Sequence, residues 1–515
     1  MKKSRFNLSH EVLLTADFGT LIPILVQECL PGDKFRISTE MFTRFQALIA
    51  PAMQRVDAKI EYFFVPNRII FHEWKNYITN KDQTGDTLPR LSSGNIPSNL
   101  KGKNSLVDYM GLPCDCKTML DDGTWQDMPA NWANVNALPF IAYQRIWYDW
   151  YSDQNLQAST RTGLEDSQGE FNTYLSGSIS PNIYCRLRNR CYPRDYFTSA
   201  LPWAQAGEAA RVPIHVPDGT GAQANGFQLH SYPLSSSDPL KLDGGWVKAG
   251  STVPKFTIAD GSKFTGPTIE EMRRTNAIQR WLEKNARYGR RYIEQIAAHF
   301  GVRVPDYRLD RSEYLGSNKA PISISEVLQQ SQTTEESPLG DFAGHAVGAG
   351  ISSMRPYRCD EHGYIIGILS FIPRASYGEG VPRPFIKSSY LDFAFPEFDR
   401  IGEQPIQYQE LDGYTSGSAL NTFGYVPRYW EYKRAFNRFC GEFRDNLAYW
   451  HLGRIFGQLN QPALNADFIT IDGGQSGRQN ERIFAVQDGE TPHILVQLYH
   501  HISAVRPLSN KPPKL

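Results

Sequence analysis

The feature that most constrains the fold is a short stretch that is almost entirely apolar. Residues 363–372 read Gly-Tyr-Ile-Ile-Gly-Ile-Leu-Ser-Phe-Ile and are followed by Pro373. A short apolar run that ends at a turn residue is typical of a strand buried on both faces. Lys59–Val65 and Ile494–Ile502 predict two more strands, and no regular helices separate the three. This spacing favours an antiparallel β-sandwich over a βαβ repeat.

Two segments predict helices. Thr268–Glu271 is a capping-box pattern, and Gly301 fits a C-terminal cap, so a helical insertion is expected over 268–300. Gly289 lowers the helix propensity in the middle of this segment, so the sequence is compatible with one long helix or with two shorter helices. Pro139–Trp150 predicts a second helix, because aromatic and aliphatic residues crowd it.

Two long segments predict loop insertions with little core. Residues 79–135 and 207–266 are rich in Asn, Asp, Gly and Ser. Loops of this length inside a compact fold are usually functional or disordered.

The composition excludes several classes of protein. The chain has 515 residues with 54 Lys+Arg against 54 Asp+Glu, so any contact with nucleic acid must come from local patches. At 41% hydrophobic residues, the chain is not a disordered one. The N-terminal residues lack an apolar signal-peptide core, and no run approaches the roughly 20 residues of a membrane span. Seven cysteines, a sparse and odd number, predict folding in a reducing compartment.

Catalytic and cofactor motifs do not appear in the sequence. It contains no H-E-x-x-H, G-x-S-x-G or G-x-x-x-x-G-K-[ST], and Cys114-Asp-Cys116 lacks the partner ligands that zinc needs. No cofactor, metal site or catalytic residue is therefore predicted. Adjacent His500 and His501 alternate across a predicted strand, so at most one of them is buried. The alternative is a carbohydrate-binding or carbohydrate-active β-sandwich, with aromatic and carboxylate side chains of 79–135 contacting a sugar.

Basic residues gather near both ends of the chain. Three lie among the first ten residues without an acid, and three among the last ten. Such patches attract phosphate without reading base sequence. The candidate contacts are Lys2, Lys3, Arg5, Lys511 and Lys514. A second candidate set is Arg186, Arg188 and Arg190, which an extended strand would place on one face; these arginines fit intersubunit ion pairs as well.

Six blocks, in one order and spanning nearly the whole chain, carry a family resemblance. They are Leu21-Ile-Pro with Glu28-Cys-Leu-Pro-Gly-Asp33 and Tyr62-Phe-Phe-Val-Pro-Asn-Arg68; Leu138-Pro-Phe140 with Ile146-Trp147; Arg194-Asp-Tyr-Phe-Thr-Ser-Ala-Leu-Pro-Trp203; His299-Phe-Gly-Val302 with Glu313-Tyr-Leu-Gly316; Glu361-His-Gly-Tyr-Ile-Ile-Gly367; and Phe423-Gly-Tyr425 with Trp450-His-Leu452 and Val505-Arg-Pro507. Together they resemble the major capsid proteins of microviruses (Microviridae), in the gokushovirus-like branch. Segment 207–266 matches none of the blocks.

The resemblance implies a mainly β fold, an eight-stranded antiparallel viral jelly roll with long loop and helical insertions. It implies a structural protein, not an enzyme, which self-assembles from about sixty copies into a T=1 icosahedral shell around circular single-stranded DNA. The implied partners are internal scaffolding, DNA-pilot and small basic DNA-binding proteins and a host surface receptor. The implied location is the virion, assembled in the cytoplasm of a host bacterium. Segment 207–266 becomes the candidate for an outward protrusion that meets the host, and the alternative is an ordinary surface loop.

Overall fold

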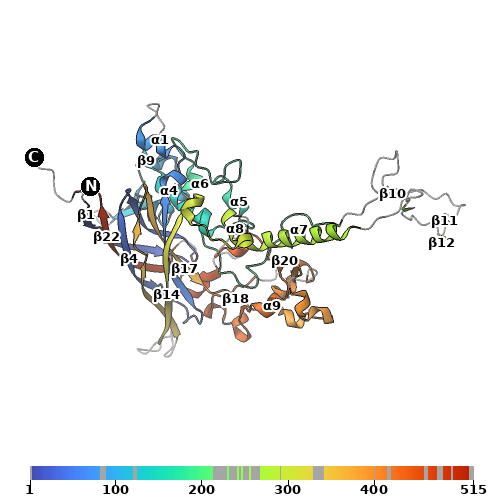
Figure 1. Cartoon of the computed structure of the whole chain (residues 1–515). Coiled ribbons are helices and arrows are strands. Elements are labelled where there is room, and N and C mark those ends of the chain that lie inside the picture. The colour runs from blue at the N-terminus through green and yellow to red at the C-terminus, as the bar shows by residue number, and fades with distance from the viewer. Residues whose placement is uncertain are drawn as a thin grey trace, which may run out of the picture. The chain divides into compact units, whose positions relative to one another are not determined.

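A computed structural model describes most of the 515-residue chain (Figure 1). The described residues are 3–81, 88–119, 124–212, 229–230, 241–242, 245–246, 255–256, 267–289, 291–328, 342–399, 401–414, 419–456, 462–471, 479–488 and 491–509. The chain divides into two compact units, one made of 1–204 with 286–515 and the other of 205–285.

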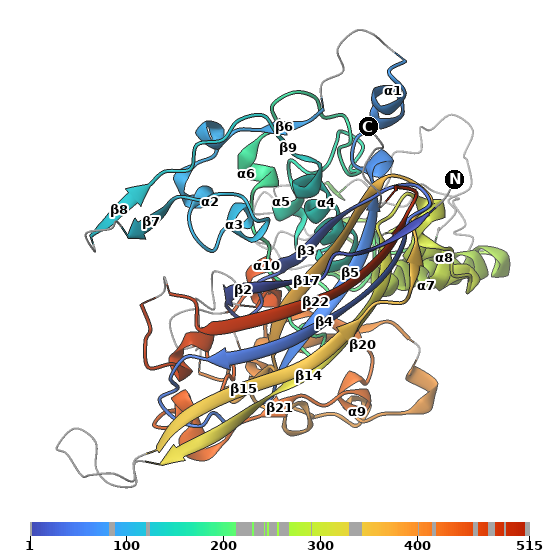
Figure 2. The ribbon, with the colours of Figure 1, turned by 90° about the vertical axis from the view of Figure 1, so that its left-hand side faces the viewer.

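Eight long antiparallel strands build the first unit. They are β2 (His10–Ala16), β3 (Ile22–Cys29), β4 (Lys34–Phe45), β5 (Val56–Pro66), β14 (Glu313–Leu328), β15 (Phe342–Ser353), β17 (Gly363–Pro373) and β22 (Ile494–Arg506). One half of the curled sheet has the order β2-β22-β4-β15 and the other β14-β5-β17-β3, and the β14–β15 pair joins them (Figure 2). The first strand pairs with the eighth, the second with the seventh, the third with the sixth and the fourth with the fifth. This nested pairing is the jelly roll, as the resemblance predicted.

A hydrophobic core lies between the two halves of the sheet. On β4 and β22 buried and exposed residues alternate, so each strand turns one face to this core and the other to the outside. Phe35, Ile37 and Met41 on β4 meet Val496 and Leu498 on β22 in one buried cluster with residues of β5, β14 and β17. Two short strands extend the first half: β1 (Ser4–Asn7) pairs with β22, and β16 (Tyr357–Arg358) with β4.

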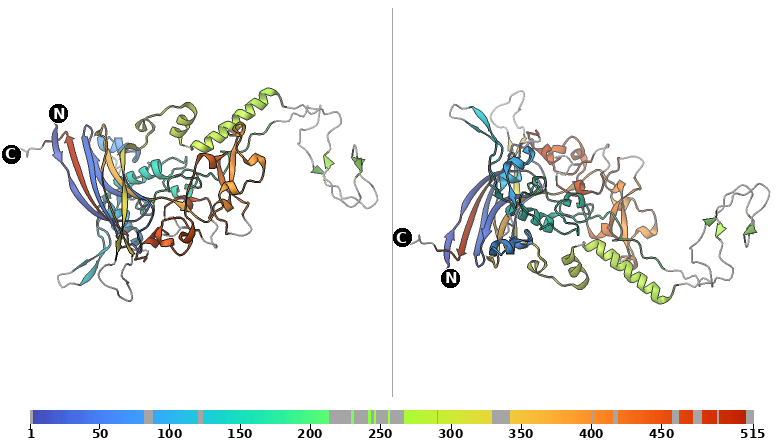
Figure 3. Two further views of the ribbon diagram at one scale, coloured as in Figure 1. Left: turned by 90° about the horizontal axis from the view of Figure 1, so that it is seen from below. Right: turned by 90° about the horizontal axis from the view of Figure 1, so that it is seen from above.

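The other half of the sheet is covered on both faces. Every residue of β17 is buried, as its apolar sequence predicted. Ile365 and Leu369 face the sandwich core, whereas Ile366 and Ile368 join a second cluster beneath α4 (Leu138–Ile146). Figure 3 shows α4 on the side of the sandwich away from β22. A π-helical turn, η3 (Trp147–Tyr151), continues α4, so the predicted helix at 139–150 is confirmed with a widened last turn.

Two long connections carry the remaining elements of the first unit. Residues 67–312 join β5 to β14, and 374–493 join β17 to β22. Segment 79–135 contributes Leu91, Ile96, Leu106 and Val107 to the second core cluster, so its described part holds more core than its polar composition predicted. The shorter helices and strands are α1 (Trp74–Thr79), β6 (Arg90–Leu91), α2 (Ser98–Lys101), α3 (Leu106–Tyr109), β7 (Cys116–Met119), β8 (Trp125–Met128), β9 (Val135–Asn136), α5 (Ala158–Arg161), α6 (Pro181–Tyr184), β18 (Ser376–Tyr377), β19 (Glu403–Gln407), β20 (Thr422–Pro427), α9 (Trp430–Lys433), β21 (Asn437–Arg438) and α10 (Ala466–Ile469).

The helical insertion at 268–300 forms two helices. These are α7 (Ile269–Tyr288) and α8 (Tyr292–Phe300), and Gly289 between them has a φ of +96° that favours glycine. The predicted cap at the start of α7 is present, because the Glu271 backbone N–H donates to Thr268 Oγ1 over 3.2 Å. The predicted C-terminal cap of α8 is Gly301, with a φ of +69°.

Among its described residues, the second unit contains most of α7 and four two-residue strands. The strands are β10 (Leu229–His230), β11 (Lys241–Leu242), β12 (Gly245–Trp246) and β13 (Lys255–Phe256), and they form the antiparallel pairs β10–β13 and β11–β12. Gln279 on α7 accepts a hydrogen bond from the Ala210 backbone N–H at 3.2 Å and donates one to Gln205. These bonds attach the start of the unit to its helix.

A chain of hydrogen bonds crosses the sandwich at His500. The Tyr62 hydroxyl donates to Thr39 Oγ1 at 2.7 Å, Thr39 Oγ1 lies 2.8 Å from His500 Nδ1, and His500 Nε2 lies 3.0 Å from the Ile24 carbonyl oxygen. Because a carbonyl can only accept, Nε2 carries the proton and Nδ1 accepts from Thr39. His500 is fully buried while His501 is exposed, as the alternation predicted.

The subunit should lose stability through His500 as the pH falls from about 6.5 to about 4. Burial, together with the nearby His10 ring, lowers the pKa of His500 to about 4 from 6.5. In this window the unfolded chain takes up a proton that the folded chain does not, so acid favours unfolding. The whole pKa difference between the unfolded and the folded chain corresponds to about 3 kcal/mol of folding stability. Urea unfolding of unassembled subunits at a series of pH values measures it.

The matched variant is His500→Gln, which removes the titrating group. The wild type should be more stable than this variant by a margin that shrinks between pH 6.5 and pH 4. A margin that stays constant across this range would contradict the assignment of His500 as a neutral, buried imidazole.

Candidate nucleic-acid interface

The outer face of the first half of the sheet carries basic side chains in two neighbouring rows. On β1 Arg5 lies opposite Val505 of β22, and Val505 lies opposite Lys34 of β4. In the next exposed row of the same three strands, Ser503 stands between Asn7 and Arg36. Arg5, Lys34 and Arg36 are all exposed, because strand alternation sends Phe35 and Ile37 into the core and leaves their neighbours outside.

A groove of about 480 Å³ runs between two of these cations. Arg5 and Arg36 line it with Asn7, Ser38 and Ser503, and Arg5 Nε donates to Ser503 Oγ over 2.9 Å. No acidic residue belongs to the described lining of this groove. His501, which also lines the groove, contacts the Glu40 carboxylate at 2.9 Å. Guanidinium, amide and hydroxyl groups in one row can contact consecutive phosphates of an extended strand.

The structure describes some of the predicted basic contact residues at the N-terminal end of the chain and none of those at the C-terminal end. Lys3 is exposed and donates a hydrogen bond to the Gly32 carbonyl. Arg506, at the other end, forms an ion pair with Asp33 at 3.3 Å and donates to the Glu28 carbonyl at 2.6 Å. Lys2, Lys511 and Lys514 lie outside the described residues. Of the predicted end residues, Lys3 and Arg5 are thus described as exposed cations.

The prediction that Arg186, Arg188 and Arg190 share one face of a strand is wrong. The segment is not a strand, and only Arg186 is exposed. Arg188 is 5% exposed; it donates to Gln144 Oε1 at 2.7 Å, and its guanidinium lies 4.3 Å from the Trp147 ring centroid. Burial and the neighbouring charge of Arg186 lower the pKa of Arg188 to about 10.

Arg190 is engaged within the subunit as well. It forms an ion pair with Glu61 at 2.5 Å within one copy of the chain, not the ion pair between subunits that was the alternative. Arg188 and Arg190 therefore leave the candidate interface, and Arg186 stays a prediction.

Lys34 and Arg36 join the candidate interface on their position in the structure, and the sequence prediction did not include them. The sequence contains a usable signal, because Lys34-Phe-Arg-Ile37 alternates basic and apolar residues as a half-exposed strand does. What the sequence does not contain is the pairing of β4 with β22, which brings these residues beside Arg5.

The described residues show neither a cluster of metal ligands nor a membrane-spanning helix. Within the described part of the chain, no three His, Cys, Asp or Glu side chains gather as they would around a metal ion. No helix in that part combines the length and the apolar character that crossing a membrane requires.

Comparisons with known proteins agree with the jelly roll and with each other. The model of a family described as "Capsid protein (F protein)" matches residues 1–512. Capsid protein VP1 of Chlamydia phage 1 is 31% identical, covering 99% of this chain and 94% of that protein. Capsid protein VP1 of Bdellovibrio phage phiMH2K is 30% identical, and that of Spiroplasma virus 4 is 24% identical, each covering 98% of this chain and 94% of the relative.

These matches extend over nearly the full length of the chain and favour the capsid prediction over the carbohydrate-binding alternative. They support a major capsid protein of a bacteriophage, found in the virion and able to associate with copies of itself. With a full-length family match and two relatives at 30% identity or above, the chain belongs to the microvirus family of F-type capsid proteins.

Proposed function

We propose that about sixty copies of this chain close into a T=1 icosahedral shell around a circular single-stranded DNA genome. The family assignment supports self-assembly into a shell. The role is structural, with no catalytic step. Internal scaffolding, DNA-pilot and small basic DNA-binding proteins are the proposed viral partners, and assembly takes place in the cytoplasm of a host bacterium.

The outer face of β1, together with the ends of β22 and β4 that lie beside it at Ser503, Val505, Lys34 and Arg36, is the proposed contact with the genome. The observation that carries this proposal is the set of exposed cations Arg5, Lys34 and Arg36, in two neighbouring rows, beside a groove whose described lining contains no acid. Phosphate contacts of this kind bind DNA of any sequence, which a shell around a whole genome requires. Lys2, Lys3, Lys511 and Lys514 belong to the same proposed interface, and Arg186 is a further candidate.

The second unit, 205–285, contains the segment 207–266 and is the proposed outward protrusion. It lies within the connection from β5 to β14, so it is an insertion between two strands of the jelly roll. A separate compact unit inserted in this way can vary without disturbing the sandwich. Its proposed partner is a host surface receptor.

Replacing Arg5, Lys34 and Arg36 together by glutamine should weaken DNA binding by removing phosphate contacts. Each lost contact with single-stranded DNA lowers the slope of log affinity against log salt by about 0.7, so the triple variant should lose about 2 from the slope. Binding of subunits to single-stranded oligonucleotides of two unrelated sequences, measured across a salt series, tests this. Both sequences should respond alike.

A charge-matched control is the triple substitution Arg273→Gln, Arg274→Gln and Arg280→Gln on α7. These residues are exposed and belong to the second unit. The control should keep the wild-type slope. Equal slopes for the wild type and the Arg5, Lys34 and Arg36 variant would remove the sheet face from the interface.

A further inference from the structure

The hairpin formed by β7 and β8 extends from the first unit with little packing of its own (Figure 2). All four residues of β8 are exposed, and β7 alternates half-buried and exposed residues. Met119 lies opposite Trp125, and the two are 61% and 67% exposed. An isolated two-stranded hairpin is marginally stable in water, and large apolar side chains at its exposed end indicate a binding surface.

The base of this hairpin is held firmly. The Asp115 carboxylate accepts the Ala130 backbone N–H at 2.8 Å and pairs with Lys101 at 3.3 Å. The Trp132 indole donates to the Pro113 carbonyl at 2.9 Å. The hairpin is therefore presented in a defined direction, which reduces the entropy lost when it binds a partner.

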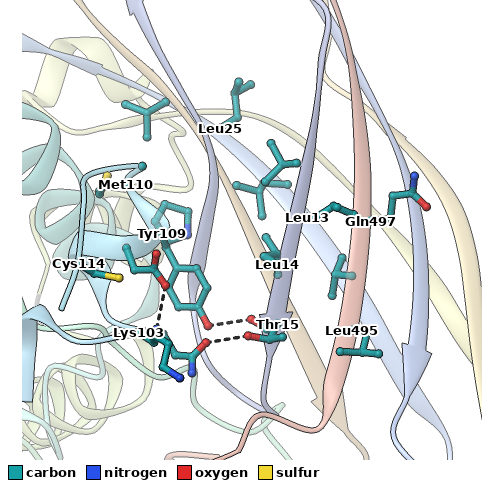
Figure 4. Close-up of a pocket in the computed structure, with 18 of the residues that line it drawn as sticks. Leu13, Leu14, Thr15, Leu25, Lys103, Tyr109, Met110, Cys114, Leu495 and Gln497 are labelled. Carbon is teal, nitrogen blue, oxygen red and sulfur yellow. Dashed lines mark hydrogen bonds between the residues drawn. The ribbon is translucent and has the colours of Figure 1, made fainter. Parts of the chain in front are cut away.

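An apolar groove of about 1090 Å³ lies near the hairpin base (Figure 4). Leu13 on β2 and Leu495 on β22 form one wall, and Tyr109 and Met110 lie across from them. The Tyr109 hydroxyl donates to the Thr15 carbonyl at 2.8 Å and ties the two walls together. Leu13 is 77% exposed and Leu495 46%, so the groove presents apolar surface that the subunit does not cover.

The hairpin and the groove match in charge as well as in apolar character. Segment 116–128 contains one lysine and three aspartates in its sequence, a formal charge of −2, and Asp121 and Asp122 among them lie outside the described residues. The groove is lined by Arg44 and Lys103 with Asp108 as its one acid among the described residues, a formal charge of +1. Cys116 at the hairpin base lines the groove of its own chain, whereas Met119, Trp125 and Met128 do not belong to the described lining, so these three side chains do not fill the groove of their own copy.

We infer that the β7–β8 hairpin of one copy docks, through Met119 and Trp125, in the groove beside Leu13 and Leu495 of a neighbouring copy. This inference rests on the proposed self-assembly and identifies one of the contacts between copies that would hold the shell together. A contact between two different surface patches links copies head to tail, and such contacts close into rings when the rotation between copies allows it.

Mixed disulfide formation tests the contact directly. Subunits with Leu13→Cys and, separately, subunits with Met119→Cys and a size tag are assembled together and then mildly oxidised. A cross-linked product that contains both subunits supports the inference. Phe385→Cys, at an 80% exposed position elsewhere in the first unit, replaces Met119→Cys in the control and should give no such product. Particles that assemble without the mixed product would overturn the inference.

A second variant measures how much the contact contributes to the free energy of assembly. Trp125→Ser should leave urea unfolding of the free subunit unchanged, because the side chain is exposed, but raise the concentration for half-assembly by about tenfold or more. Assembly is followed by sedimentation, where sixty copies of a 58.4 kDa chain give a particle of about 3.5 MDa. Unchanged assembly of Trp125→Ser would overturn the inference. Failure of the wild type itself to form particles would instead contradict the proposed function.

Discussion

Replacing Glu61 by alanine should destabilise the subunit by about 3–5 kcal/mol, because it removes the carboxylate from a buried cluster of charges. Glu61 on β5 lies 2.5 Å from Arg190 and 2.5 Å from Lys59, and it accepts a hydrogen bond from the Tyr151 hydroxyl at 2.8 Å. Burial alone would raise the pKa of Glu61, but Arg190 and Lys59 hold it below its ordinary value. Without the carboxylate, two cations are left with little water to solvate them. Urea unfolding of free subunits measures the loss.

Two further variants show whether charge is the cause. Glu61→Gln keeps an acceptor for Tyr151 but loses the charge, so its stability should fall between those of the wild type and Glu61→Ala. Asp360→Ala removes one partner of the exposed Arg358–Asp360 pair, 3.2 Å apart, and should cost less than about 1 kcal/mol. If Glu61→Ala costs no more than Asp360→Ala, the buried cluster does not stabilise the fold.

Replacing Phe63 by alanine should also destabilise the subunit by about 3–5 kcal/mol, through a cavity between β5 and the helical layer. Phe63 is 1% exposed, and its ring centroid lies 5.7 Å from Trp150, 5.9 Å from Tyr151 and 5.7 Å from Tyr314. The substitution therefore weakens the attachment of η3 and the start of β14 to the sheet. Urea unfolding of free subunits is again the measurement.

The matched control for Phe63 is Phe385→Ala. Phe385 is 80% exposed, so its removal should change the free energy of unfolding by no more than about 0.5 kcal/mol. Because Glu61 and Phe63 stand on the same face of β5, the double variant should deviate from the sum of the single effects. A loss at Phe63 no larger than the loss at Phe385 would show that the aromatic cluster tolerates the cavity.

Much of the secondary structure can be predicted from local patterns. The strands at 59–65, 363–372 and 494–502 follow from short apolar runs, and each lies inside a longer strand, β5, β17 or β22. The division of the helical insertion follows from Gly289. Strand pairing could not be derived in this way, because β2 pairs with β22 across almost the whole chain. The jelly roll order came from family resemblance and not from any property of the individual strands.

The candidate interface shows the same division between local and distant information. Arg5 lies in a short basic segment, which is visible in the sequence, and its exposure agrees with its proposed role. Arg190 has the same formal charge, but its partner Glu61 is 129 positions away. Charge alone does not reveal such a partner, so cationic residues of the interior and of the surface look alike in a sequence.

The position of β22 has a consequence for synthesis on the ribosome. This strand is the last of the eight to be made, yet it lies between β2 and β4 rather than at an edge. Until β22 is translated, β2 lacks the strand with which it pairs. Arg5 on β1 is likewise not yet connected to Lys34 and Arg36 on β4, because β22 lies between these two strands. A nascent subunit thus cannot complete its sandwich early, and only fully translated copies offer a finished surface to their neighbours.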